Sequence, residues 1–307
     1  MFKWARKSAV LYLLIFLLGT RIFDLNKIHL KILNFLVVPV DYLYDLSKGE
    51  AAFNKEIFGA YLDYYKQFIK YSPHSPDALG MLAFCYSYLG DQPKAVSLYK
   101  KAILLEPAFF WFHYNLGALY FKQGKYPEAA ASLRRAFSVE RKKTLNLLFN
   151  SHILFYLGPS ERFDFPVKKA TAQKDVYSDM ANHLKEGLDH CQEMLVLSYF
   201  RMKAYPQMLK WAEVGIEHRQ GDIPFFYFHG GVAAYQLENY PKAVLFLNKC
   251  IEKDPGYMDA YYYLGLTLKV MKKDDQAAVV FKAYDSLRAM YPQGRPMDRK
   301  EYSLMVF

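Results

Sequence analysis

A step of 34 residues recurs along the sequence and constrains the fold more than any other feature. Residues of the segment that begins near Pro76 reappear 34 positions later in the segment that begins near Phe110. The recurring pairs are Leu82 and Leu116, Ala83 and Gly117, Tyr86 and Tyr120, Gly90 and Gly124, Pro93 and Pro127, Ala95 and Ala129, and Ala102 and Ala136. The same step links Tyr227, Gly231, Ala243 and Leu247 to Tyr261, Gly265, Ala277 and Phe281. One short unit cannot bury its apolar face alone, so units repeated at a fixed step must stack on one another.

Each repeated unit places small and large apolar residues at fixed positions. Gly117 and Gly231 are two of the small ones. Small side chains let helices approach each other, and large ones fill the spaces between units. In its period and in these positions the sequence resembles the tetratricopeptide repeat family. The resemblance implies an all-α helical solenoid built from antiparallel helix pairs.

A proline recurs at one place in four units, at the predicted start of the second helix. These prolines are Pro93, Pro127, Pro206 and Pro241. Proline suits the first helical position, because no partner inside the helix awaits the missing N–H. Three of the prolines follow a tyrosine, namely Tyr126, Tyr205 and Tyr240. The Tyr-Pro pairs are therefore predicted to mark a turn and not a functional site.

The resemblance covers most of residues 59–288. Four good or fair repeats begin near Pro76, Phe110, Pro224 and Met258. A weaker repeat begins near Asp189 and carries Val196 and Met208 where small residues are expected. Between the two groups of repeats, Gly158, Pro159 and Pro166 with mixed charges predict a loop or insertion.

The chain is accordingly divided into six predicted segments. Residues 1–25 are a signal-anchor or transmembrane-like helix, and residues 26–58 are an apolar helical linker that fits either an interfacial helix or a core helix. Residues 59–141 form a first repeat array, 142–182 a divergent helix and loop insertion, 183–290 a second array, and 291–307 a tail.

The N-terminal sequence MFKWARKSAVLYLLIFLLGTRIFD predicts a hydrophobic anchor helix. Lys3, Arg6 and Lys7 precede an uncharged run from Ser8 to Thr20. A positive start followed by an apolar block is typical of a signal sequence or signal anchor, and the residues before Thr20 make a poor cleavage site. We therefore expect residues 8–25 to hold the chain at a membrane, with its bulk on the extracytoplasmic side. A cleaved signal, a helix buried in protein and a bulk on the cytoplasmic face are the alternatives.

Aromatic residues are predicted to gather on the concave face of the solenoid. The resemblance assigns the second, fifth, ninth and twelfth positions of each repeat to this face. The candidate partner-binding residues at these positions are Trp111, Tyr114, Phe121, Phe225, Phe228, Tyr235 and Tyr262. Such a surface suits an apolar helix or an extended segment of a partner. The alternative is that the aromatic side chains pack on one another.

Motifs for chemistry are scarce in the sequence. Neither a phosphate-binding glycine loop nor a Gly-x-Ser-x-Gly nucleophile motif occurs. His183, Glu186 and His190 share one helical face and are a candidate zinc set, but nothing nearby supplies a second motif, and a polar helix face on a weak repeat explains them better. We therefore predict no enzyme, no cofactor and no metal.

The charged residues argue against nucleic acid as a partner, and the cysteines argue against a disulfide framework. The net charge is +10, but the basic residues are dispersed. The densest group lies around a predicted helix end, where cations suit the helix dipole, and consists of Arg134, Arg135, Arg141, Lys142 and Lys143. Nucleic acid and small-molecule substrates are therefore not the expected partners. Cys85, Cys191 and Cys250 form no disulfide framework and are predicted to be buried in helices.

These observations predict a non-catalytic interaction scaffold or assembly subunit of a membrane or envelope complex. Its partners would be other protein subunits bound through the aromatic groove. The alternative is a soluble secreted or periplasmic binding protein of the same repeat type with a cleaved signal peptide.

Overall fold

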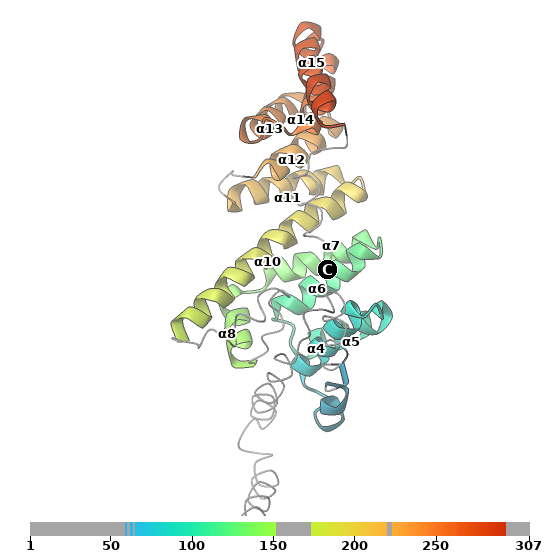
Figure 1. The fold of residues 1–307 in the computed structure, drawn as a ribbon, viewed down its shortest axis with the longest axis vertical. Helices are drawn as coiled ribbons and strands as arrows, with labels where there is room; N and C mark the ends of the chain where they lie inside the picture. The colour runs from blue at the N-terminus through green and yellow to red at the C-terminus, as the bar shows by residue number, and fades with distance from the viewer. Residues whose placement is uncertain (1–58, 60–61, 64, 152–172, 220–222, 293–307) are drawn as a thin grey trace, which may run out of the picture. The chain divides into compact units, whose positions relative to one another are not determined.

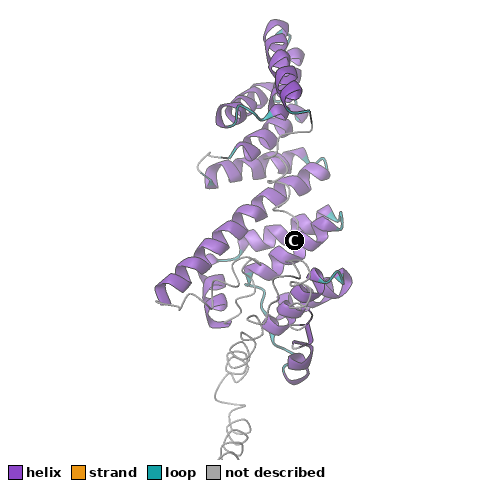
Figure 2. Cartoon of the chain, in the orientation of Figure 1, coloured by secondary structure: helices purple, strands orange, loops and turns teal. Residues whose placement is uncertain are grey.

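The computed structural model describes residues 59, 62–63, 65–151, 173–219 and 223–292, and these form helices joined by short turns (Figure 1). No strand occurs within these ranges (Figure 2). The prediction of an all-α fold is therefore confirmed for the described residues. The predicted anchor over residues 1–25 and the linker over 26–58 lie outside them. No helix in the described ranges combines the length and the apolar character needed to cross a bilayer.

The described helices follow one another in two compact units. After helical residues 65–71, they are α4 (Pro76–Tyr88), α5 (Gln92–Leu105), α6 (Phe110–Lys122), α7 (Tyr126–Ser138), α8 (Arg141–Ser151), α10 (Gln173–Arg201), α11 (Tyr205–His218), α12 (Pro224–Gln236), α13 (Tyr240–Lys253), α14 (Met258–Val270) and α15 (Asp274–Met290). The described parts of Met1–Phe112 and Glu140–Leu184 form the first unit, and those of His113–Val139 and Lys185–Phe307 form the second.

Within each unit, helices that follow one another in sequence pack together. In the first unit α4 packs on α5. In the second unit α11 packs on α12, α12 on α13, α13 on α14 and α14 on α15. This order is what stacked helix pairs require, because each pair buries its apolar face on the next.

The turns inside the helix pairs share a residue in a left-handed backbone conformation. Each contains a residue with positive φ, and these residues are Gly90 (94°), Gly124 (72°), Lys203 (54°), Glu238 (58°) and Lys272 (59°). After α6, the N–H of Gly124 donates to the carbonyl of Phe121 at 3.0 Å, and that of Lys125 to Tyr120 at 2.9 Å. These are the two bonds of a Schellman helix end, and they satisfy carbonyls that the helix itself leaves unpaired.

The recurring prolines stand at the start of the second helices, as predicted, but one residue later than the first helical position. The helix α7 begins at Tyr126, so Pro127 is its second residue. The shift carries no cost, since the first four N–H groups of a helix all lack a partner inside it. The Tyr-Pro pair is thus a helix start, and the tyrosine belongs to the helix.

Close helix crossings rest on pairs of one small and one large side chain. A Cβ added to Gly117 would lie 2.7 Å from Cγ of Leu133, so only glycine fits there. The same type of contact joins Gly231 to Leu247 and Gly265 to Phe281. In the weaker repeat the same sequence spacing pairs Val196 with Ala212, both fully buried. In sequence, the larger of the two residues there stands in the first helix and the smaller in the second, the reverse of the other repeats.

The helix α8 corrects one interpretation of the basic cluster. Arg135 does lie in the last turn of α7, where the helix dipole favours a cation. Arg141, Lys142 and Lys143 instead occupy the exposed first turn of α8, where the dipole opposes positive charge. The prediction was wrong for these three residues because α7 ends at Ser138 and a new helix begins within the cluster.

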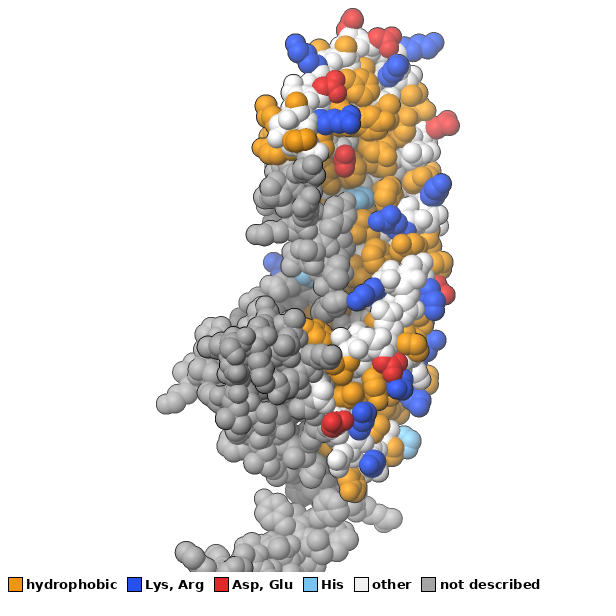
Figure 3. Space-filling view, turned by 45° about the vertical axis from the view of Figure 1, so that its right-hand side comes forward, with side chains coloured by type: hydrophobic (Ala, Val, Ile, Leu, Met, Phe, Trp, Pro, Cys, Tyr) orange, Lys and Arg blue, Asp and Glu red, His pale blue; other side chains and the backbone are white. Residues whose placement is uncertain are grey.

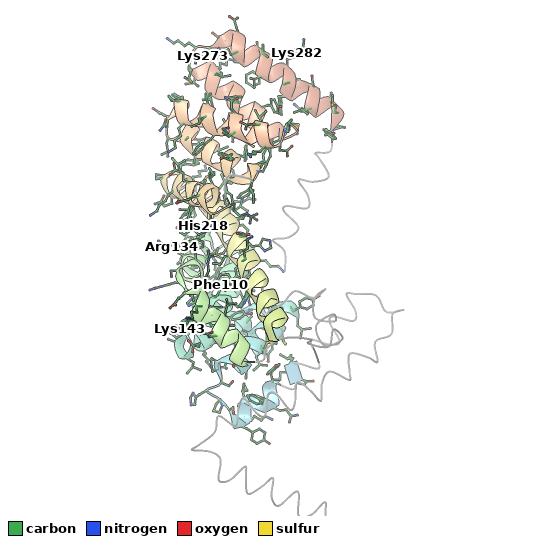
Figure 4. All side chains as sticks on the ribbon, turned by 90° about the vertical axis from the view of Figure 1, so that its left-hand side faces the viewer. Phe110, Arg134, Lys143, His218, Lys273 and Lys282 are labelled. Atoms are coloured by element: carbon green, nitrogen blue, oxygen red, sulfur yellow. The ribbon has the colours of Figure 1, made fainter. Side chains whose placement is uncertain are left out.

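Thr144 joins α8 to the start of α6. Its hydroxyl accepts a hydrogen bond from the N–H of Phe110 at 3.2 Å and donates one to the carbonyl of Ala108 at 3.2 Å. The side chain is fully buried. Figure 4 marks Phe110 on α6 and Lys143, the neighbour of Thr144, on α8. The first turn of α6 is therefore capped by a residue from a different helix.

Candidate partner-binding surface

The helix α12 contributes two different sets of residues to the second unit. One set is small and packs against α13, and the other is aromatic. A Cβ on Gly230 would lie 2.8 Å from the ring of Phe246, and one on Gly231 would lie 2.7 Å from Leu247. These glycines let α13 approach closely. Phe225, Phe228 and Tyr235 recur at helical spacing on α12 and make contacts with rings of other residues.

The seven predicted residues differ in their exposure. Trp111, in the first unit, is buried, as are Tyr114, Phe225 and Phe228 in the second unit. Burial raises the pKa of Tyr114, which therefore keeps its proton. Phe121 and Tyr235 are partly exposed, and Tyr262 has 41% of its surface exposed. Buried members contribute packing, whereas the exposed ones can contact another molecule.

The second unit brings the last four of the predicted residues into one aromatic network. Phe225 stacks on His229 with a centroid separation of 4.1 Å, and Phe228 lies 5.0 Å from the same imidazole. Tyr263 lies 5.9 Å from Phe228, 6.0 Å from Tyr235 and 5.8 Å from Tyr262. Rings separated by about 4.5–7 Å attract each other, so the network rigidifies this surface. Phe121 pairs separately with Tyr126 at 5.4 Å.

Tyr263, the centre of this network, is not among the residues that the sequence predicts for the surface. It is one of three consecutive tyrosines, Tyr261 to Tyr263, and the repeat positions select only the middle one. Burial, followed by the nearby carboxylate of Asp259, raises the pKa of Tyr263. Its hydroxyl is therefore protonated at neutral pH and can donate a hydrogen bond.

His229 is the buried histidine that contacts the phenylalanine rings of the network. Its Nδ1 lies 2.8 Å from the carbonyl oxygen of Phe225, and since a carbonyl can only accept, Nδ1 carries the proton. Burial lowers the pKa of His229 to about 4, so the ring is neutral at physiological pH. The rings of Phe200, Phe225 and Phe228 surround the imidazole.

The three cysteines are buried, and two members of the candidate zinc set have side chains outside the described ones. Cys85, Cys191 and Cys250 are buried in helices, as predicted. Burial raises the pKa of the Cys191 thiol, which donates a hydrogen bond to the carbonyl of Leu133 at 3.1 Å. The side chains of His183 and Glu186 lie outside the described ones. Among those described, no three His, Cys, Asp or Glu side chains are grouped as metal ligands.

Family models identify the repeat at the sequence level. A model described as TPR repeat matches residues 85–124, and one described as Tetratricopeptide repeat matches residues 110–142. This part of the chain thus carries tetratricopeptide repeats. Proteins of this family are typically non-catalytic scaffolds, and neither description names an enzyme.

Solved structures agree on the fold. One is the crystal structure of YrrB, described as a TPR protein with an unusual peptide-binding site. It superposes with a TM-score of 0.51 at 15% sequence identity, and the superposition covers 73% of this chain and 92% of the YrrB chain. That of MamA superposes with a TM-score of 0.50 at 16% identity and covers 69% of this chain and 98% of its own. At these identities the likeness concerns the fold alone, which is an all-α tetratricopeptide-repeat solenoid.

Curated relatives match over shorter stretches. The photosystem I assembly protein Ycf3 of Prochlorococcus marinus (strain NATL2A) is 33% identical over 98 residues, which are 29% of this chain and 56% of that protein. The small glutamine-rich tetratricopeptide repeat-containing protein 2 of Mycosarcoma maydis is 27% identical over 94 residues, 31% of this chain and 27% of that protein. The chain thus spans about half and about a quarter of the length of these two relatives.

Proposed function

We propose that the protein is a non-catalytic scaffold or assembly subunit that binds another protein on the aromatic surface of α12 and α14. The observation that carries this proposal is the partly exposed aromatic network around Tyr263. Its members Tyr235 and Tyr262 are partly exposed, and Tyr263 joins them to the buried Phe228. Aromatic side chains of this kind supply most of the binding energy in protein interfaces. A rigid network loses little conformational entropy when a partner binds.

The charge distribution supports a protein partner over a polyanion. On the face shown in Figure 3, acidic and basic side chains are interspersed among hydrophobic ones. Nucleic-acid binding requires a continuous basic surface, which this face lacks. The relative from Prochlorococcus is named as an assembly protein, and a similar assembly role fits the proposal.

We further propose that the partner belongs to a membrane or envelope complex. The support is the uncharged run over residues 8–20, which follows three cations in the sequence. A scaffold held at a membrane meets membrane subunits at high effective concentration.

Site-specific photocrosslinking tests the binding surface. A photoreactive phenylalanine analogue replaces Tyr262, which is 41% exposed, and in a matched control it replaces Leu245, which is 56% exposed on α13. After irradiation of intact cells, mass spectrometry identifies the captured protein. We expect a specific adduct from position 262 and none from position 245.

The same experiment can refute the proposal. Capture of the same proteins at both positions would show non-specific contact. Crosslinks from position 262 only to other residues of the same chain would show that the protein's own side chains cover the aromatic surface.

A further inference from the structure

Five tyrosines of the second unit form a continuous row, which we call the tyrosine ladder. In order of contact they are Tyr240, Tyr235, Tyr263, Tyr262 and Tyr284, with successive centroid separations of 6.1, 6.0, 5.8 and 5.4 Å. They come from α12, α13, α14 and α15, so the row crosses several helices. Each is partly or largely exposed.

The ladder presents tyrosine hydroxyls, which can donate or accept a hydrogen bond. Within the described residues, the five hydroxyls make no hydrogen bond, in contrast to the neighbouring Tyr261, which donates to the carbonyl of Pro255 at 2.9 Å. None of them is among the buried polar atoms, so they remain open to solvent. The ladder therefore presents apolar rings together with hydroxyl donors.

The ladder residues carry no charge, and among the described cation–π contacts no lysine or arginine lies over their rings. The cation–π contacts described are those of Lys66 and Lys94 over Tyr86, and of Lys242 over Phe246. A cationic ligand would meet a chain of net charge +10 and is disfavoured. The matching ligand is therefore apolar and rich in acceptors.

We infer that the ligand of the tyrosine ladder is a proline-rich segment of a partner protein in the polyproline II conformation. This inference rests on the proposed function and specifies its partner. Such a segment has no internal hydrogen bonds, and its prolines lack N–H groups, so it brings free carbonyl acceptors and no unmatched donors. It has three residues per turn and a rise of about 3.1 Å per residue, so residues on one face recur about every 9 Å, and aromatic-lined surfaces dock such segments.

Other peptide conformations match less well. The ring separations of the ladder do not by themselves select a peptide conformation. A helix, however, uses its carbonyls internally, so its backbone offers no acceptor to the tyrosine hydroxyls. A β-strand would need a sheet edge to pair its N–H groups, and the described residues contain no strand.

Fluorescence anisotropy of a labelled decaproline peptide, titrated with the full-length chain in detergent, tests the inference. The comparison peptides, of equal length, are an alanine-rich helical sequence and a glycine-serine sequence. We expect decaproline to bind at least about tenfold more tightly than either, since its conformation is preformed and its carbonyls match the hydroxyls.

The variants Tyr235→Phe and Tyr262→Phe remove a hydroxyl and keep the ring. Each should weaken decaproline binding about fivefold to tenfold, the usual contribution of one hydrogen bond. The matched control Tyr71→Phe changes a tyrosine that is 82% exposed and lies outside the ladder, and it should leave binding unchanged. Circular dichroism confirms that each variant folds.

Three results would overturn the inference: no binding of decaproline, binding of the helical peptide as tight as that of decaproline, or unchanged binding in both ladder variants. These results would leave the proposed function standing as long as position 262 captures a partner in cells. Failure of the photocrosslinking would refute the proposed function independently.

Discussion

Two glycines of the same repeat are required for different physical reasons. Gly124 has a φ of 72°, and a Cβ added there would meet nothing within 4 Å, so its constraint is conformational. Gly117 is helical, and a Cβ there would overlap Leu133. The two positions should therefore respond differently to the same replacements.

We expect Gly124→Ala to lower the free energy of unfolding by about 1 kcal/mol, since the left-handed conformation penalises alanine. Gly124→Asn should cost less, because asparagine adopts this conformation more readily. At Gly117 the order reverses: alanine costs about 1–3 kcal/mol through overpacking, and asparagine costs more. Urea unfolding measures both series. The same order at both positions would contradict this account.

A second residue-scale prediction concerns His229. Its folded pKa, about 4, lies below the unfolded value of about 6.5. Below pH 6.5 the unfolded chain therefore binds a proton that the folded chain excludes. The stabilisation is fully present above pH 6.5 and is lost as the pH falls toward 4. The loss amounts to roughly 2–3 kcal/mol, at about 1.4 kcal/mol for each pKa unit.

The variant His229→Phe isolates this contribution. Phenylalanine keeps an aromatic ring beside Phe225 and Phe228 but does not titrate. The free energy of unfolding, measured by urea titration at pH 7 and pH 4.5, should fall less in the variant than in the wild type. An equal fall in both proteins would show that other groups govern the acid sensitivity.

How far the sequence predicts this surface can be judged from single residues. The crossing glycines and the recurring prolines follow from the repeat step, because each repeat imposes the same local packing. The role of Tyr263 does not follow from it. Tyr262 and Tyr263 are adjacent and chemically identical, and only the packing of α12 and α15 around them decides which rings they meet.

At the scale of elements, Thr144 of α8 caps the start of α6. The sequence hides this link because the capping residue follows Phe110 by one repeat step and belongs to another helix. We expect Thr144→Val to lower the free energy of unfolding by about 1–2 kcal/mol, because the N–H of Phe110 and the carbonyl of Ala108 lose their partner.

Hydrogen exchange shows where the effect arises. The amides in the first turn of α6 should lose protection in Thr144→Val, whereas those of α4 should not. Thr144→Ser keeps the hydroxyl and should restore most of the protection at α6. Loss of protection in the serine variant, with protection retained in the valine variant, would indicate that the methyl group, and not the hydrogen bond, is what matters.

At the scale of the whole molecule, the repeats and the N-terminal sequence contribute different parts of the proposed role. The repeats define a rigid surface with exposed tyrosines, and this part rests on described contacts. The membrane attachment rests on the sequence of residues 8–25 alone. A membrane segment can be predicted from sequence because its transfer into a bilayer depends mainly on local composition. A binding surface cannot be predicted in this way, because it is formed by residues that are distant in the sequence.

Membrane attachment predicts that the full-length chain stays in the membrane pellet after carbonate extraction. The double substitution Leu14→Arg with Leu17→Arg should move it to the supernatant, because each arginine at the centre of an inserted helix costs about 2.5–3.5 kcal/mol. The matched control, Leu104→Arg with Leu245→Arg, adds the same charges at exposed positions of the repeats and should stay in the pellet. A wild-type chain found in the supernatant, with a mature N-terminus beyond Thr20, would instead favour a secreted protein with a cleaved signal.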